Sequence, residues 1–239
     1  MNGMNTAPYQ DFAREKLGFE FTNLDLLITA LTHRSYVNEH RKSVHHHNER
    51  LEFLGDAVLE LGGNGIFVYA FFLEPEGILT AWRAALVRTE SIGDAGDKLG
   101  YGPLIRMSKG EKNGSDRAHL QILANAFEAV IGAIYLERGF DDARDFIHKH
   151  IIVKLDGILE SGSWRDPKSY LQEISQRVDN QTPVYKVLSE EGPDHDKVFT
   201  LGVFVGDNMM GRGIGPSKQV AQQQAARAAI AKYKESGEK

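Results

Sequence analysis

The hydrophobic periodicity of this 239-residue chain changes near residue 160. Before that point apolar residues recur every three or four positions, which is the spacing of amphipathic helices. After it, a helical stretch precedes three stretches that alternate like strands, and an Ala- and Gln-rich helix follows. The pattern predicts an all-α domain at 1–160, a linker at 161–167 and a small α+β domain at 168–239.

The second domain is expected to have the order helix, three strands, helix (α-β-β-β-α). Helices are predicted at 168–178 and 217–234, and strands at 184–190, 198–205 and 209–214. A turn at Gly206-Asp-Asn208 favours an antiparallel sheet with both helices on one face. The run Gly211-Arg-Gly-Ile-Gly215 lacks the spacing and the βαβ context of a phosphate-binding loop, so no nucleotide cofactor is expected.

An acidic stripe marks the stretch 48–61 of the first domain. In a helix Glu49, Glu52 and Asp56 fall within about 60 degrees of one another, and the opposite face carries Leu51, Leu54, Val58 and Leu61. Like charges at this spacing repel, and a divalent cation would relieve the repulsion. Oxygen ligands without His or Cys favour Mg²⁺, Mn²⁺ or Ca²⁺. A solvated acidic face remains the alternative.

A second helix, predicted at 120–137, places Asn125 and Glu128 on a common face. If it packs beside the acidic helix, the two would form an oxygen-rich site. Further helices are expected at 11–17, 23–31, 64–73, 78–99 and 141–159. The pair His33 and Ser35 is not expected to be catalytic, because adjacent side chains diverge and no orienting acid is evident.

Composition narrows the cellular setting. There is no cysteine, and the first residues lack the basic and apolar regions of a signal peptide. No apolar run approaches the roughly 20 residues of a membrane span, so a cytoplasmic protein without membrane contact is expected. The net charge of −5 is concentrated in the first 165 residues.

The residues Asn-Glu-Arg-Leu-Glu-Phe-Leu-Gly-Asp at 48–56 resemble the signature of bacterial ribonuclease III. Three further stretches agree with the family in order and spacing, together with a double-stranded-RNA-binding pattern at the C-terminus. These stretches are His33-Arg-Ser-Tyr36, Glu76-Gly77 and Leu123-Ala-Asn-Ala-Phe-Glu-Ala129. The resemblance covers nearly the whole chain.

The resemblance implies a homodimeric, metal-dependent endonuclease in which each subunit cuts one strand of an RNA duplex. It implies Mg²⁺ as cofactor, with Mn²⁺ as a substitute, 5′-phosphate and 3′-hydroxyl products, and processing of ribosomal and other structured RNAs. An acidic nuclease is reasonable because its cations screen the carboxylates from phosphate. The implied residues are Glu52, Asp56, Asn125 and Glu128 for the metal, Asp56, Glu128, Glu49 and Glu76 for catalysis, and Phe53 for the dimer interface.

Asn125 departs from the family, whose better-known members carry Asp at this position. An amide offers one neutral oxygen, so the site should hold its metal less tightly. Two readings stay open: an active enzyme with a reduced charge count, or a silent protein that only binds double-stranded RNA.

In the second domain the resemblance places Ser169, Gln172 and Glu173 against one minor groove of the duplex and His195 against the next. Such contacts recognise A-form shape more than sequence. Of the lysines that usually contact the intervening phosphates, only Lys218 is present. Weak and less salt-sensitive binding by this domain is therefore expected.

Overall fold

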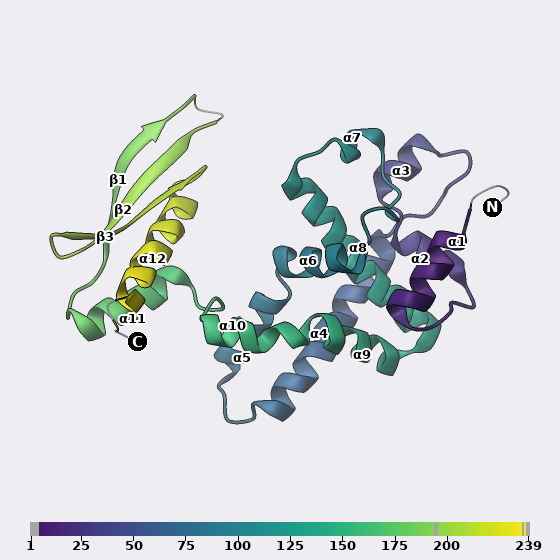
Figure 1. Ribbon diagram of the computed structural model, residues 1–239, viewed down its shortest axis with the longest axis horizontal. Helices are drawn as coiled ribbons and strands as arrows, with labels where there is room; N and C mark the ends of the chain where they lie inside the picture. Colours follow the sequence, from purple (N-terminus) through teal and green to yellow (C-terminus); the bar gives the residue numbers. More distant parts are fainter. Residues whose placement is uncertain (1–4, 194–195, 236, 238–239) are drawn as a thin grey trace. The chain divides into compact units, whose positions relative to one another are not determined.

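The computed structural model describes residues 5–193, 196–235 and 237. The chain divides into two compact units, Met1–Ser161 and Gly162–Lys239. The N-terminal unit is helical, and the C-terminal unit combines a sheet with two helices (Figure 1). The fold class expected from the periodicity, an all-α domain followed by an α-β-β-β-α domain, is confirmed.

The N-terminal unit is built from short helices packed around two long ones, α4 and α8. Its elements are α1 (Ala7–Phe12), η1 (Ala13–Leu17), α2 (Leu24–Ala30), α3 (Arg34–Glu39), α4 (Glu49–Ala70), α5 (Glu76–Leu86), α6 (Thr89–Leu99), α7 (Lys109–Lys112), α8 (Asp116–Arg138), α9 (Phe140–His150), η2 (Ile152–Lys154) and α10 (Leu155–Ser161).

Two helices predicted as continuous are interrupted. The stretch 78–99 forms α5 and α6, because Arg88 adopts an extended backbone and becomes the N-cap of α6. The stretch 141–159 forms α9, η2 and α10, with a break at Ile151. Neither break carries Gly or Pro, and the apolar spacing continues across both. The sequence pattern therefore gave no sign of an interruption. Helix α8 starts four residues earlier than predicted, where the Ser115 hydroxyl accepts a hydrogen bond from the Ala118 amide (3.3 Å).

Helices α4 and α8 touch backbone to backbone at two glycines. A Cβ on Gly55 would lie 1.8 Å from the carbonyl oxygen of Glu128, and one on Gly132 would lie 2.3 Å from the carbonyl oxygen of Leu51. Both distances are far below van der Waals contact. The two helices can therefore reach this separation only because each carries a glycine where the other's backbone crosses it.

Helix α8 forms the centre of the N-terminal core. Its buried residues include Phe127 and the run Ala129–Ile134. Within the described ranges α8 is the one helix long and apolar enough to cross a membrane, and just over half of its most apolar window is buried inside the protein. A core helix of a folded unit has this composition, because its apolar residues face its neighbours on most sides.

In the C-terminal unit, α11 (Pro167–Val178) and α12 (Lys218–Glu235) pack against a three-stranded antiparallel sheet in the order β1-β2-β3 (Figure 1). The strands are β1 (Val184–Glu191), β2 (Val198–Val205) and β3 (Asn208–Gly215). These bounds lie within two residues of those predicted. Leu171, Val203 and Tyr233 lie in the core between the sheet and the two helices.

The run Gly211–Gly215, which superficially resembles a phosphate-binding loop, lies in β3, and its glycines have a packing role. Gly211, Gly213 and Gly215 alternate along the strand, and a Cβ on Gly211 or Gly213 would lie 2.3 or 2.2 Å from backbone oxygens of α12. Their shared role is to let the Ala-rich helix lie directly on the strand. The run is a packing surface of the sheet.

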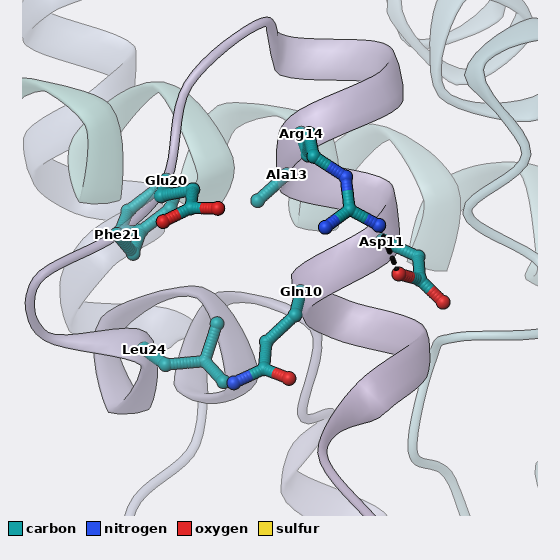
Figure 2. A pocket seen from close by; sticks show the side chains of 7 residues that line it. All are labelled: Gln10, Asp11, Ala13, Arg14, Glu20, Phe21 and Leu24. Atoms are coloured by element: carbon teal, nitrogen blue, oxygen red, sulfur yellow. Dashed lines mark hydrogen bonds and ion pairs between the residues drawn. The ribbon is translucent and has the colours of Figure 1, made fainter.

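A pocket of about 230 Å³ lies between α1, η1 and the start of α2, where Arg14 and Asp11 form an ion pair (Figure 2). Gln10, Glu20 and Leu24 also line it. None of its lining residues belongs to the predicted site.

Replacing Gly55 tests the contact between α4 and α8. Gly55→Ala should lower the free energy of unfolding by on the order of 2 kcal/mol or more, because the added methyl meets the backbone of α8. Gly157→Ala in α10 is the control, because nothing lies within 4 Å of a Cβ there; it should be neutral or stabilising by up to about 1 kcal/mol. Urea unfolding at one protein concentration measures both. Equal effects would refute the close contact.

Candidate active site

The first turn of α4 presents the acidic stripe. Asn48 precedes the helix and is almost fully buried. Its backbone N–H donates a hydrogen bond to the backbone carbonyl of Thr32 (2.9 Å). This contact fixes where the helix begins. Glu49 and Glu52 then lie in the first turn, where the positive end of the helix dipole stabilises negative charge.

Three carboxylates from the two long helices influence one another. Burial, followed by the charges of Glu49 and Asp56, raises the pKa of Glu52. Burial, with added repulsion from Asp56 and Glu52, raises the pKa of Glu128 to about 7. Since Glu128 belongs to α8 and the other two to α4, the crossing of these helices brings the acids together. The crossing of α4 and α8 thus places Glu52, Asp56 and Glu128 within electrostatic range of one another, and their joint role as a metal site stays a prediction.

Glu49 has a different environment from the other acids. Its carboxylate forms an ion pair with Arg34 at 3.0 Å and approaches His47 at 3.8 Å. In the described ranges no Lys or Arg forms an ion pair with Glu52, Asp56 or Glu128. Glu49 is therefore neutralised within the protein, whereas the three other carboxylates are not.

Asn125 lies on α8, one turn before Glu128, and is partly buried. Its Oδ1 accepts a hydrogen bond of 2.7 Å from Nε2 of Gln121. The amide oxygen expected to face a metal is thus already in contact with a neighbouring side chain. Nothing in the sequence pattern singled out Gln121.

Glu76 is not brought to the other acids within one chain. It is exposed as the first residue of α5, where its carboxylate accepts a hydrogen bond from Thr80 (2.9 Å), and it contributes to neither the Glu52 nor the Glu128 pKa shift. Phe53 also points away from the protein, with 81% of its surface exposed. A large exposed aromatic ring next to the acids is unusual for a monomer.

His33 and Ser35 are in contact, contrary to the expectation that their side chains diverge. His33 is the N-cap of α3, and its Nδ1 lies 2.7 Å from the Ser35 hydroxyl. That hydroxyl also accepts from the Ser108 amide (3.0 Å). The contact connects α3 to the segment before α7, so its role is structural.

The donor set fits a divalent cation. Oε2 of Glu52 is buried without a hydrogen-bond partner, which is costly for a charged oxygen unless a cation completes its surroundings. The three acids provide only hard oxygen ligands. In the described residues of this single chain, no three His, Asp or Glu side chains are yet gathered as closely as a bound ion requires.

The predicted RNA-contacting residues of the C-terminal unit lie on exposed surface. Ser169, Gln172 and Glu173 share one face of α11, and the Ser169 hydroxyl donates to Asp166 (3.0 Å). Lys218 begins α12, and its Nζ forms an ion pair with Glu190 at 2.7 Å. His195 lies outside the described residues.

Comparison with known proteins supports both units. A family model described as Ribonuclease-III-like matches residues 23–155, and one described as double-stranded RNA binding motif matches residues 167–233. The chain belongs to the ribonuclease III family. It is an endoribonuclease with a double-stranded-RNA-binding domain, as the nine-residue signature predicted.

Curated relatives agree over almost the full length. Ribonuclease 3 of Anoxybacillus flavithermus is 43% identical over 233 residues, which is 95% of this chain and 96% of the relative. Ribonuclease 3 of Bacillus cytotoxicus is 43% identical over 222 residues, or 93% of this chain and 90% of the relative.

A solved structure of the nuclease domain of ribonuclease III from Campylobacter jejuni is 40% identical, with a TM-score of 0.52, and covers 59% of this chain and 96% of that one. It is described as having structural flexibility in a region involved in dimer formation. A second structure of that nuclease domain, at 2.2 Å resolution, gives a TM-score of 0.51 at 40% identity, covering 58% of this chain and 93% of that one.

The sequence of this ribonuclease III family member did not reveal several residues that shape the candidate site. Gly55 and Gly132 position the helices, and Arg34 and Gln121 engage Glu49 and Asn125. A signal existed for the glycines, because Gly inside a helix costs about 1 kcal/mol relative to Ala and needs a reason. The partners of Glu49 and Asn125 gave none, because charged and amide residues are common on helix surfaces.

Proposed function

We propose that this endoribonuclease cuts double-stranded RNA in the cytoplasm with the help of Mg²⁺, or of Mn²⁺ as a substitute. It leaves 5′-phosphate and 3′-hydroxyl ends and processes ribosomal and other structured precursor RNAs. The observation that carries the proposal is the mutual electrostatic influence of Glu52, Asp56 and Glu128. These three carboxylates lie on crossing helices, and no Lys or Arg in the described part of the chain forms an ion pair with them.

The three acids are proposed to hold the metal. When bound there, Mg²⁺ supplies activation of the attacking water and stabilisation of negative charge on the phosphate. The protein contributes the position of the ligands, which the contact between α4 and α8 fixes. Asn125 contributes at most one neutral oxygen, and that oxygen already accepts a hydrogen bond from Gln121.

Glu49 and Glu76 are proposed to assist from outside the metal site. Glu49 forms an ion pair with Arg34, and its charge contributes to the raised pKa of Glu52. Glu76 lies on α5 and is free to approach RNA or a second subunit. These roles rest on the family resemblance and on the positions of the two residues.

The alternative is a catalytically silent protein that only binds duplexes, because Asn125 is neutral. One cleavage assay separates an active enzyme from a silent binder. A long RNA duplex with Mg²⁺ should give short fragments bearing 5′-phosphate and 3′-hydroxyl ends, and Glu128→Ala should slow cleavage by about a hundredfold or more, because a metal ligand is lost. Duplex binding by the variant should persist.

Cleavage that continues at the parent rate in Glu128→Ala would refute the site. No cleavage by the parent, with duplex binding intact, would favour the silent binder. End analysis of the fragments, by a 5′-phosphate-dependent exonuclease, tests the proposed products.

A homodimer is proposed because α4 and the turn after it expose an apolar surface. This surface, called the α4 apolar surface, comprises Phe53, Leu61, Val68, Tyr69, Phe72 and Leu73. Leu61 was expected on the buried face, but it is largely exposed. A groove of about 590 Å³ between α4 and α9, lined by Leu61, Tyr69 and Phe140, continues the surface. A second copy of the chain would cover it, and two sites would then cut the two strands.

Phe53→Asp tests the dimer. The variant should dissociate with a constant raised about tenfold or more, because a charge would replace a buried ring. Val153→Asp is the control, since Val153 is exposed at 69% but lies in η2, outside the α4 apolar surface. Sedimentation equilibrium measures both. A dimer of unchanged strength in Phe53→Asp would remove Phe53 from the interface.

The C-terminal domain is proposed to bind the duplex weakly because Lys218 is shared. To contact phosphate, Lys218 must leave Glu190, with which it forms an ion pair in the free protein. Ser169, Gln172 and Glu173 lie on exposed surface and are proposed to contact a minor groove. His195 keeps its proposed role in the neighbouring groove.

Duplex affinity at several salt concentrations, measured with the non-cleaving Glu128→Ala protein, tests this view. Adding Glu190→Gln should tighten binding about two- to fivefold, because Lys218 is released and an anion is removed. Adding Lys218→Met should reduce the slope of log affinity against log salt by about 0.9 or less. A starting slope as steep as that of a relative with several lysines at this helix start would contradict weak phosphate contact.

A further inference from the structure

The hydrogen bond between Gln121 and Asn125 decides which end of the Asn125 amide is available. Gln121 lies one turn before Asn125 on α8, and its Nε2 donates to Oδ1 over 2.7 Å. Glu128 lies on the same face, three residues after Asn125. Along the helix axis, Gln121 and Glu128 therefore lie on opposite sides of Asn125.

An amide carries its oxygen and its amino group on opposite sides of one carbon atom. Because the oxygen of Asn125 accepts a hydrogen bond from Gln121, its amino group is turned away from Gln121. An amino group donates hydrogen bonds to carboxylates and cannot ligate a cation. Held in this way, the amide of Asn125 would not offer its oxygen to a cation bound by the three acids.

We propose that Gln121 is a positioning residue that holds Asn125 as a hydrogen-bond donor, so that Glu52, Asp56 and Glu128 bind the cation without direct ligation by Asn125. The proposal rests on the metal-dependent function proposed above.

In the variant Asn125→Asp, the hydrogen bond from Gln121 would not decide which atom faces the cation. A carboxylate has an oxygen at both ends, so Gln121 can hold one oxygen while the other faces the cation. Removing the donor at position 121 should therefore matter in the parent chain and not in the Asn125→Asp background. This difference separates an orienting role of Gln121 from a general effect on the stability of α8.

Isothermal titration of Mn²⁺ into RNA-free protein measures the effect without any cleavage. Gln121→Met keeps the length of the side chain and removes the donor, and it should tighten Mn²⁺ binding about twofold, because the freed amide can turn its oxygen inward. Asn125→Asp should tighten binding by about tenfold, because it adds a charged oxygen. Adding Gln121→Met to Asn125→Asp should bring no further gain.

The chain contains a matched control for the helical amide pair. Gln176 Nε2 donates to Asn180 Oδ1 (3.0 Å) at the end of α11 in the C-terminal unit. Gln176→Met removes a bond of the same type and the same spacing, away from the acids, and should leave Mn²⁺ affinity unchanged. The Mg²⁺ concentration that half-saturates cleavage should follow the same order among the variants.

Weaker Mn²⁺ binding in Gln121→Met would overturn the proposal, because it would mean that Gln121 directs the oxygen toward the metal. Equal effects of Gln121→Met in the two backgrounds would overturn it as well. Absence of Mn²⁺ binding in every variant would instead refute the metal site itself. Binding that responds to Glu128→Ala but not to Gln121→Met would leave the metal site intact and remove only the role of Gln121.

Discussion

The candidate active site depends on the distance between two helices, and that distance depends on two glycines, which have no side chain at the point where the helices cross. Gly55 of α4 lies against the backbone of Glu128, and Gly132 of α8 lies against the backbone of Leu51. The contact is reciprocal, so neither helix can shift without opening it. Asp56 follows Gly55 directly, and Glu128 itself supplies the backbone that Gly55 touches. Close packing and the juxtaposition of the acids are therefore one feature of the fold.

The close packing of α4 and α8 also brings carboxylates near one another, and their mutual repulsion is unfavourable in the free protein. Glu52 and Glu128 are partly buried near each other and near Asp56, and their pKa values are raised as a result. Among these acids, and within the residues that the structure describes, Glu49 alone has an arginine partner. A bound cation, as proposed, would relieve this repulsion. The packing of α4 on α8 thus keeps these acids near one another in spite of the electrostatic cost.

Glycine performs the same task in the C-terminal unit with a different geometry. On β3 the glycines occur at every second position, which is the period of a strand, and they face α12. In the helical unit Gly55 and Gly132 are single positions at a crossing. In both places a missing side chain lets two backbones approach closely. The packed layer of the C-terminal unit supports α11, which carries the residues proposed to contact RNA.

The sequence by itself determined the class of both domains, the strands of the sheet within two residues, and the helices that carry the acids, because these follow from the local period of apolar residues. The signature at 48–56 also determined the family, since a specific order of residues is legible without coordinates. The breaks at Arg88 and Ile151 were invisible, because the backbone turns there without Gly or Pro and the apolar spacing continues.

Only the tertiary structure decided which acids meet. Glu128 joins Glu52 and Asp56 through a crossing of helices far apart in the chain, whereas Glu76, equally acidic, remains apart from them in one subunit. It also decided the state of individual groups: Glu49 is paired with Arg34, Lys218 with Glu190, and the oxygen of Asn125 with Gln121. Residue types and spacing specify what each side chain can do, but the partner of an exposed polar group depends on contacts in space that no local pattern records.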